Sequence, residues 1–155
     1  MLSGADLLLG GAGDDGASGA VGADVLRGGA GDDTLAGDWG RDVLVGGEGA
    51  DELRGGPGGD VFRFASAAEI GWGGGSDVIV DLGTGDRIDL RGVDADTGTR
   101  GVQGFEFVGA DWFSGAAGEL RFSGGRLTGG AGDDGAIDFA LVVSGGELTA
   151  ADLLL

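Results

Sequence analysis

Residues 1–63 read MLSGADLLL, GGAGDDGAS, GAVGADVLR, GGAGDDTLA, GDWGRDVLV, GGEGADELR and GGPGGDVFR, seven nonapeptides with no insertion between them. The fourth residue of every unit is Gly, the sixth is Asp, and the eighth is apolar. A phase kept over seven units identifies an internal repeat, which is the sequence signature of a solenoid.

Each unit predicts a turn followed by a short strand. The six residues GGxGxD turn the chain, because Gly accepts positive φ and close backbone approach. The next three residues form a strand whose middle side chain points inward. Two units make one flattened coil, and coils stack about 4.8 Å apart, as neighbouring strands do. We therefore predict an all-β fold with a parallel β-roll over residues 1–63.

The sixth-position carboxylates form two columns in such a roll, because units alternate between its two edges. One edge stacks Asp6, Asp24, Asp42 and Asp60, and the other stacks Asp15, Asp33 and Asp51. Neighbouring bare carboxylates repel by about 1 kcal/mol in water and about 3–4 kcal/mol at a near-surface dielectric. The sum rivals the stability of a small domain, about 5–15 kcal/mol, so we expect the metal-free roll not to fold.

A divalent cation between successive turns reverses this repulsion. Oxygen ligands at flexible spacing suit Ca²⁺ better than Mg²⁺, so we predict about five calcium ions, one for each adjacent pair on an edge. Asp14, Asp32 and Asp38 lie at other phases and are interpreted as solvated turn residues. The alternative is a metal-free solenoid that uses Asp for turn chemistry alone. The predicted ligands are the sixth-position carboxylates and turn glycines: Asp6, Asp15, Asp24, Asp33, Asp42, Asp51, Asp60, Gly11, Gly13, Gly22, Gly29, Gly31, Gly40, Gly47 and Gly49.

Residues 1–63 resemble the calcium-binding nonapeptide repeats of RTX proteins. From residue 64 to 155 we predict a second domain, a β-rich cap that covers the open end of the solenoid. Its expected elements are a helical turn at 66–69, where Ser66 and Glu69 have capping-box spacing, and strands at 61–65, 77–82, 86–90, 105–108, 119–122 and 137–143.

The cap segment also resembles the C-terminal domain of serralysin-type metallopeptidases in GSDVIVDLGTGDRIDLRGVDADTGT (75–99), FEFVGADWFSGAAGELRF (105–122) and DFALVVSGGELTAADLLL (138–155). The resemblance implies a module that follows a separate catalytic domain, which this chain lacks. Family members often carry an acidic loop where this chain reads GAGDDGAIDF (130–139). A calcium site there, with Asp134 and Asp138, is left open. Asp77, Asp81, Asp86 and Asp89 are another candidate group, which polar rims of half-buried strands explain equally well.

The composition excludes several classes of function. The net charge of −18 disfavours nucleic acid and anionic membranes. The absence of Cys and His excludes thiol catalysis, a Ser-His-Asp triad and zinc sites with such ligands. Asp133 and Asp134 are paired acids without a pocket-forming constellation, so we predict no enzyme activity.

We also expect neither an N-terminal signal peptide nor a membrane span. Residues 148–155 (LTAADLLL) resemble the export signals of type I secretion, which predicts a bacterial extracellular protein.

The two outer faces of the roll differ in polarity. The face of the odd-numbered units carries Leu7, Leu9, Val25, Arg27, Val43, Val45, Val61 and Arg63, whereas the other face is polar. A contiguous apolar patch usually contacts something, so we hypothesise that the later chain or the missing catalytic domain covers it.

The predicted function is that of a secreted, non-catalytic calcium-binding module that folds on Ca²⁺ binding. The alternative is a glycan-binding or adhesive module of an extracellular enzyme or surface protein.

Overall fold

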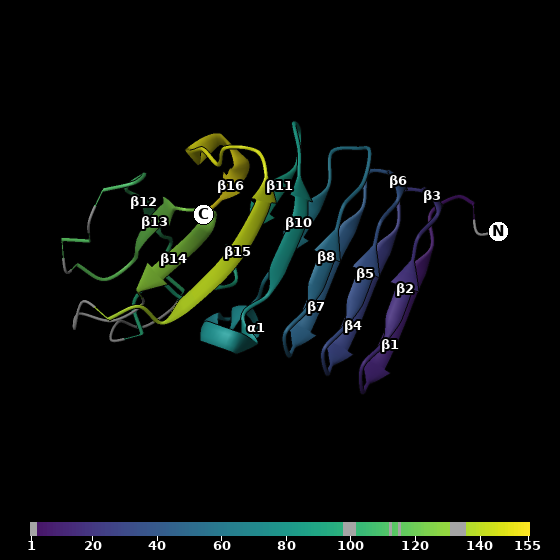
Figure 1. The fold of residues 1–155 in the computed structure, drawn as a ribbon, viewed down its shortest axis with the longest axis horizontal. Coiled ribbons are helices and arrows are strands. Elements are labelled where there is room, and N and C mark those ends of the chain that lie inside the picture. The colour runs from purple at the N-terminus through teal and green to yellow at the C-terminus, as the bar shows by residue number, and fades with distance from the viewer. Residues whose placement is uncertain (1–2, 98–101, 112, 115, 131–135) are drawn as a thin grey trace.

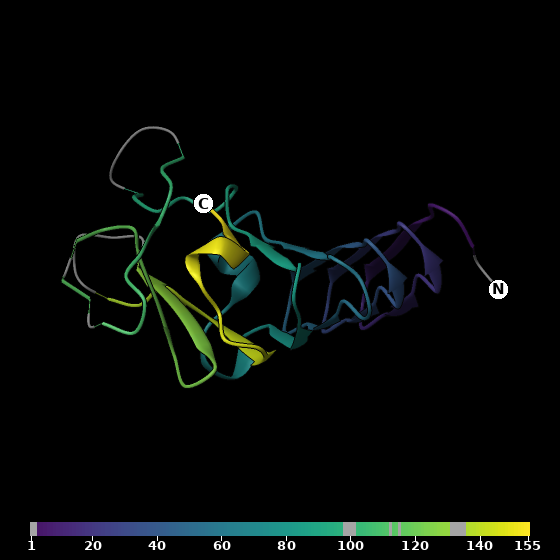
Figure 2. The same ribbon diagram turned by 90° about the horizontal axis from the view of Figure 1, so that it is seen from above.

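The computed structural model describes residues 3–97, 102–111, 113–114, 116–130 and 136–155. The chain forms a flattened solenoid with the N-terminus at one end, and the C-terminal strands close the other end (Figure 1). Viewed from above, its coils stack along one axis (Figure 2). We call the edge formed by the turns at 13–15, 31–33 and 49–51 the lower edge, and the opposite edge the upper edge, as they lie in Figure 1.

Two long sheets make the two faces of the solenoid. The first contains β1 (Leu7–Ala12), β4 (Val25–Ala30), β7 (Val43–Glu48), β9 (Val61–Arg63), β11 (Arg87–Asp89) and β16 (Leu153–Leu154), in that order. The second runs in the order β12 (Glu106–Phe107), β13 (Glu119–Ser123), β14 (Arg126–Gly130), β15 (Phe139–Gly145), β10 (Val78–Leu82), β8 (Glu52–Arg54), β5 (Thr34–Ala36) and β2 (Gly16–Ser18). A small sheet on the upper edge pairs β3 (Val21–Gly22) with β6 (Trp39–Gly40).

The strands of the repeats pair in parallel with a register of one coil. Leu8 pairs with Leu26, and Leu44 pairs with Phe62. These eighth-position side chains point inward, and Leu26, Leu44 and Phe62 are fully buried. The predicted parallel β-roll is confirmed.

The two sheets of the roll continue past Arg63. Ile79 of β10 pairs with Leu53, and Ile88 of β11 pairs with Phe62, both in parallel. The step along the sequence is 26 residues instead of 18, because residues 64–71 insert eight residues between the coils. The insertion contains α1 (Ala67–Ile70), whose N-cap Ser66 accepts a hydrogen bond from the N–H of Glu69 at 3.3 Å, as the spacing predicts. A short 3₁₀ turn, η1 (Gly73–Gly75), follows.

The C-terminal part adds antiparallel strands to the second sheet. β13 and β14 form a hairpin, and β15 pairs antiparallel with β14 and parallel with β10. We did not predict β14, whose sequence RLTGG has little strand propensity. Gly124 and Gly125 both have positive φ, and such a pair suits a tight two-residue hairpin turn. The predicted strand at 137–143 lies at 139–145.

A single apolar core runs through the repeats and the C-terminal part. It joins Leu26 and Leu35 of the roll to Leu120, Phe139 and Leu153 near the end of the chain. The ring of Phe105 meets that of Phe139 edge to face, with centroids 5.6 Å apart. The last turn of helix, η2 (Ala150–Asp152), is capped by Thr149 and leads into β16. The C-terminal residues therefore belong to the folded body.

The apolar outer face of the first sheet is uncovered at its start. Leu7 and Leu9 are 64% and 66% exposed, because β11 and β16 extend this sheet instead of lying over it. In the described part of the chain, no later segment covers the start of this face, Leu7 and Leu9. That a separate domain covers it stays a hypothesis. None of the described helices combines the length and the apolar character that a membrane crossing requires.

Candidate metal centre

The sixth-position aspartates lie in two columns, one along each edge of the roll. On the upper edge, Oδ1 of Asp24 accepts a hydrogen bond from the backbone N–H of Asp6 at 2.7 Å, and Oδ1 of Asp42 accepts one from Asp24 at 2.8 Å. The lower edge repeats the contact, since Oδ1 of Asp33 accepts from Asp15 at 2.8 Å. Each carboxylate is thus fixed by the preceding coil through one oxygen.

The second oxygen of these carboxylates has no hydrogen-bond partner. It is buried and unpartnered in Asp6, Asp24, Asp33, Asp42, Asp51, Asp60 and Asp77. A buried, unpaired polar atom costs about 1–3 kcal/mol, and more when it is charged. Native proteins rarely leave such atoms without a partner, and a recurring set of them requires an explanation such as an unseen ion.

Glycine at the first position of six of the seven units leaves space beside the free oxygen. A Cβ built on Gly19 would lie 2.7 Å from Oδ2 of Asp24 and 2.8 Å from the carbonyl oxygen of Gly37 in the next coil. A Cβ on Gly37 would meet Oδ2 of Asp42 and the carbonyl oxygen of Gly55 in the same way, at 2.6 and 2.7 Å. The free carboxylate oxygen of one coil and a carbonyl oxygen of the next coil therefore lie close to the same point. Our sequence prediction named second- and fourth-position glycines and missed these first-position ones, although they are Gly in six of the seven units.

The predicted glycines at positions two and four let the coils approach closely. A Cβ on Gly29 would lie 2.1 Å from the carbonyl oxygen of Gly11, and one on Gly40 would lie 1.5 Å from that of Gly22. The same close stacking holds for Gly31 against Gly13, and for Gly47 and Gly49 against the coil before them. Their assignment as metal ligands stays a prediction.

The columns contain two aspartates that we did not place in the repeat. Oδ1 of Asp77 accepts the N–H of Asp51 at 2.9 Å, and Oδ1 of Asp86 accepts the N–H of Asp60 at 2.9 Å. The signal was present in the sequence, because 72–80 (WGGGSDVIV) and 81–89 (DLGTGDRID) keep Asp at position six and Ile at position eight. The insertion of residues 64–71 hid this phase.

Burial and mutual repulsion raise the pKa of four column aspartates, Asp42, Asp51, Asp60 and Asp77. Burial, with smaller contributions from the charges of Asp51 and Glu69, raises the pKa of Asp77 to about 8. Burial, with the charges of Asp86, Asp42 and Asp81, raises the pKa of Asp60 to about 6. The backbone N–H bonds act in the opposite direction but do not offset desolvation. A nearby positive charge would lower these pKa values and favour the ionised carboxylates.

The other acidic candidates have different surroundings. The exposed Asp14 and Asp32 accept backbone N–H bonds from Asp32 and Ala50, at 3.0 and 2.9 Å, and Asp38 accepts the Ser18 hydroxyl at 2.5 Å, all of which suits turn residues. Asp89 is held by arginines, with its Oδ2 2.8 Å from Nη2 of Arg91 and 3.1 Å from Nε of Arg63. Asp133 and Asp134 lie outside the described residues, whereas Asp138 is exposed.

The donor set of the columns fits calcium. Across the described part of the chain, no three Asp or Glu side chains converge on one point. Each adjacent pair supplies two carboxylates, so backbone oxygens of the turns must supply the remaining ligands. Ca²⁺ accepts such a mixed oxygen set with flexible geometry.

Known proteins share the repeats and the fold. The family model described as RTX calcium-binding nonapeptide repeat (4 copies) matches residues 2–24, 18–53 and 36–65. The solution structure of the AlgE6R2 subunit of a mannuronan C5-epimerase from Azotobacter vinelandii is similar, with TM-score 0.59, 27% identity, and coverage of 99% of this chain and 91% of that one. The AlgE6R3 subunit of the same source is 27% identical over 98% of this chain and 78% of that one, with TM-score 0.35. No curated protein sequence matches the chain.

Proposed function

We propose that this chain, whose residues 2–65 are RTX calcium-binding repeats, is an extracellular module that folds when calcium occupies the two aspartate columns. The observation that carries the proposal is the set of seven buried carboxylate oxygens without partners, all at one phase of the repeat. Such a set is unfavourable in a metal-free roll and favourable around a cation. Calcium binding and folding are then a single thermodynamic event.

The protein's own groups divide the work of binding. The N–H of each column aspartate orients the carboxylate of the next coil, and this fixes which oxygen stays free. The first-position glycines keep the space beside that oxygen open, and carbonyl oxygens of the next turn face the same point. Bound calcium supplies the positive charge that cancels repulsion along the column. We propose the sixth-position aspartates and turn glycines predicted from the sequence as the parts of this site.

The proposed folding event also gives a route out of the cell. Extracellular calcium modules bind at about 10⁻⁴–10⁻³ M, so cytosolic calcium would leave the columns empty and the chain unfolded. Residues 148–155 then act as a type I export signal while the chain is unfolded. After export they join the sheet, because β16 pairs with β11 and Leu153 is buried. The secretion machinery is accordingly a proposed partner.

The parent protein is proposed to be an extracellular enzyme or surface protein. Resemblance of residues 75–155 to serralysin-type C-terminal domains suggests a metallopeptidase. The similar AlgE6R2 subunit comes instead from a mannuronan C5-epimerase, which suggests an enzyme that modifies a polysaccharide. In both cases this chain acts as the non-catalytic module, and the catalytic domain is a separate unit.

Glycan binding is the second candidate, and an exposed ridge on the upper edge favours it. Trp39 is 66% exposed and pairs with Val21, which is 51% exposed. On the other side of Trp39, the exposed Pro57 accepts the N–H of Gly40 through its carbonyl oxygen at 3.1 Å. Neighbouring exposed apolar side chains suit stacking against a sugar ring, and the exposed Arg41 lies two residues from Trp39. Titration of the calcium-loaded chain with mannuronan oligomers should quench Trp fluorescence, and Trp39→Ala should abolish the response; an unchanged response excludes this ridge.

The test of the main proposal is a calcium titration followed by far-UV circular dichroism after removal of metal with EDTA. We expect a cooperative change from coil to β structure near millimolar calcium, and no such change with magnesium. A chain that is already folded in EDTA at neutral pH would overturn the coupling of folding to binding. Isothermal calorimetry in the same buffers then shows whether calcium binds at all.

A further inference from the structure

The proposed calcium sites between adjacent column aspartates form a series along each edge, which we call the calcium ladder. We propose that this ladder extends beyond the nonapeptide run into two further sites, Asp51–Asp77 on the lower edge and Asp60–Asp86 on the upper edge. Both use residues that follow the insertion and lie outside the family match, which ends at residue 65. The proposal rests on the function proposed above, since it adds members to the same ladder.

The first argument is geometric equivalence. Within the repeats, the N–H of one column aspartate lies 2.7–2.8 Å from Oδ1 of the next. Across the insertion the same contact measures 2.9 Å on both edges. The backbone pairing is equivalent too, because Val78 and Arg87 donate their N–H groups to the carbonyls of Asp51 and Asp60, each at 2.8 Å. The insertion thus leaves the register of both columns intact.

The second argument is burial without a partner. Asp60 and Asp77 are fully buried and Asp51 is 1% exposed, and Oδ2 of all three has no hydrogen-bond partner. Asp86 differs, because its Oδ2 accepts the N–H of Gly83 at 2.8 Å. The upper site therefore depends on the free oxygen of Asp60, and the lower site has a free oxygen on each aspartate.

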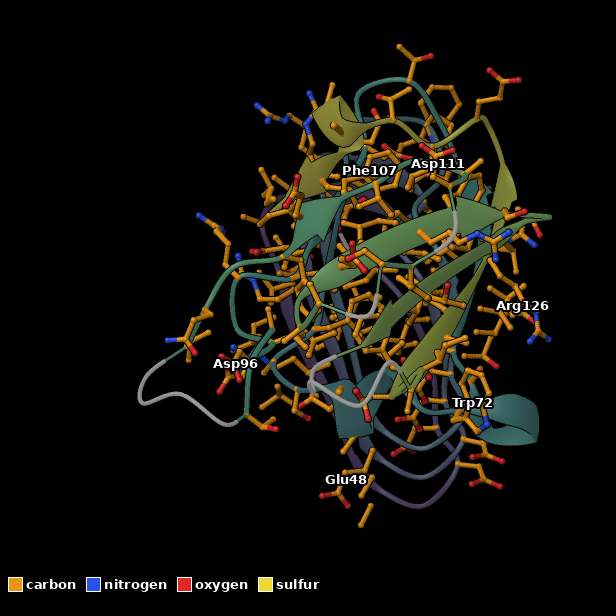
Figure 3. The ribbon with its side chains drawn as sticks, turned by 90° about the vertical axis from the view of Figure 1, so that its left-hand side faces the viewer. Glu48, Trp72, Asp96, Phe107, Asp111 and Arg126 are labelled. Atoms are coloured by element: carbon orange, nitrogen blue, oxygen red, sulfur yellow. The ribbon has the colours of Figure 1, made fainter. Side chains whose placement is uncertain are left out.

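The third argument is the presence of a further carboxylate near the end of each column. Both oxygens of Asp81 accept N–H bonds, from Gly55 and Gly56 at 2.9 Å, which holds a third carboxylate in the turn that precedes Asp60. On the lower edge, Glu69 of α1 lies close enough to Asp51 and Asp77 to act on both electrostatically. Figure 3 shows Trp72 and Glu48 in the lower part of the molecule. The three ion pairs found among the described residues all involve Asp89 or Asp152, not these acids.

The ladder stops after these two sites because apolar residues occupy the next positions. Val142 pairs with Val78, which places Leu141 after Asp77, and Leu153 pairs with Ile88, which places Ala151 after Asp86. The contacts make four adjacent pairs on the upper edge and three on the lower edge. The calcium-saturated chain is therefore expected to hold seven ions instead of the five that residues 1–63 predict.

Native mass spectrometry of the full chain in saturating calcium counts the ions directly. We expect seven in the unmodified chain and one fewer in each of Asp77→Asn and Asp86→Asn, whose amide oxygen still accepts the backbone N–H. Asp14→Asn is the control, since it removes an equal charge from a roll turn at another phase and should retain all seven. Five ions in the unmodified chain, or no loss in the two variants, would overturn the two added sites alone. No bound calcium at all would overturn the proposed function.

A second measurement avoids variants, in case either one fails to fold. Crystals grown in calcium give anomalous density at each bound ion. Peaks beside Oδ2 of Asp60 and Asp77 would support the proposal. Peaks confined to the five pairs within residues 1–63 would contradict it.

Discussion

At the scale of single residues, Gly40 shows how closely the coils stack. Its φ is +151°, and a Cβ at this position would lie 1.5 Å from the carbonyl oxygen of Gly22. Gly40→Ala should therefore separate two coils and lower the calcium-dependent stability by more than about 3 kcal/mol. Gly16→Ala is the matched control, because a Cβ there meets nothing within 4 Å. Urea unfolding in saturating calcium measures both, and equal midpoints for the two variants would refute the stacking argument.

The pKa values of the column aspartates predict how the calcium-free chain responds to pH. The pKa is raised from 3.8 to about 8 for Asp77 and to about 6 for Asp60. A folded-state pKa above the unfolded value means that the folded state binds more protons between these limits, so its stability falls as pH rises from about 4 to 8. In EDTA, we expect more β structure by circular dichroism at pH 5 than at pH 8. Asp77→Asn should flatten this dependence, and a chain that gains structure as pH rises would contradict the assignment.

At the scale of secondary-structure elements, Asp89 links β9 and β11 through its arginine partners. The side-chain bond from Arg91, assisted by Arg63, lowers the pKa of Asp89 to about 2. Its stabilising contribution is present above pH 4 and is lost as pH falls towards 2. Asp89→Asn should cost about 1.5–3 kcal/mol at pH 7, the usual range for hydrogen bonds to charged groups. Thermal unfolding measures the loss, with the exposed Asp111→Asn as a charge-matched control that should leave the melting temperature unchanged.

Elements with a strict repeat were predictable from the sequence, and interrupted elements were not. Asp6 to Asp60 recur at one phase, and this is enough to predict strand direction, register and both columns. Asp77 and Asp86 keep the same local pattern, but α1 and its flanks shift them by eight residues. β14 is defined by its partners β13 and β15 more than by its own residues. The first-position glycines recur in the sequence, but their role could not be predicted from it, because only the structure shows which atoms face them.

At the scale of the whole molecule, the core does not divide at Arg63. Phe62 pairs with Ile88 and Leu53 pairs with Ile79, and all four side chains are buried in one cluster with Phe139 and Leu153. Removing residues 64–155 would expose the last coil of the repeats and delete both proposed end sites. A chain of residues 1–63 should therefore remain unfolded at a calcium concentration that folds the full chain.

Circular dichroism of the two chains at equal calcium tests whether the division predicted at Arg63 is also a boundary of folding. Both chains keep the column aspartates from Asp6 to Asp60, so a difference in folding reports on what residues 64–155 add, namely the burial of Phe62 and Leu53 and the two proposed end sites. Full β structure in the short chain would mean that calcium bound between the aspartates of residues 1–63 is enough to stabilise the roll. An unfolded short chain would mean that ions in the five pairs of residues 1–63 do not offset the repulsion of the stacked carboxylates without the buried contacts and end sites that residues 64–155 supply.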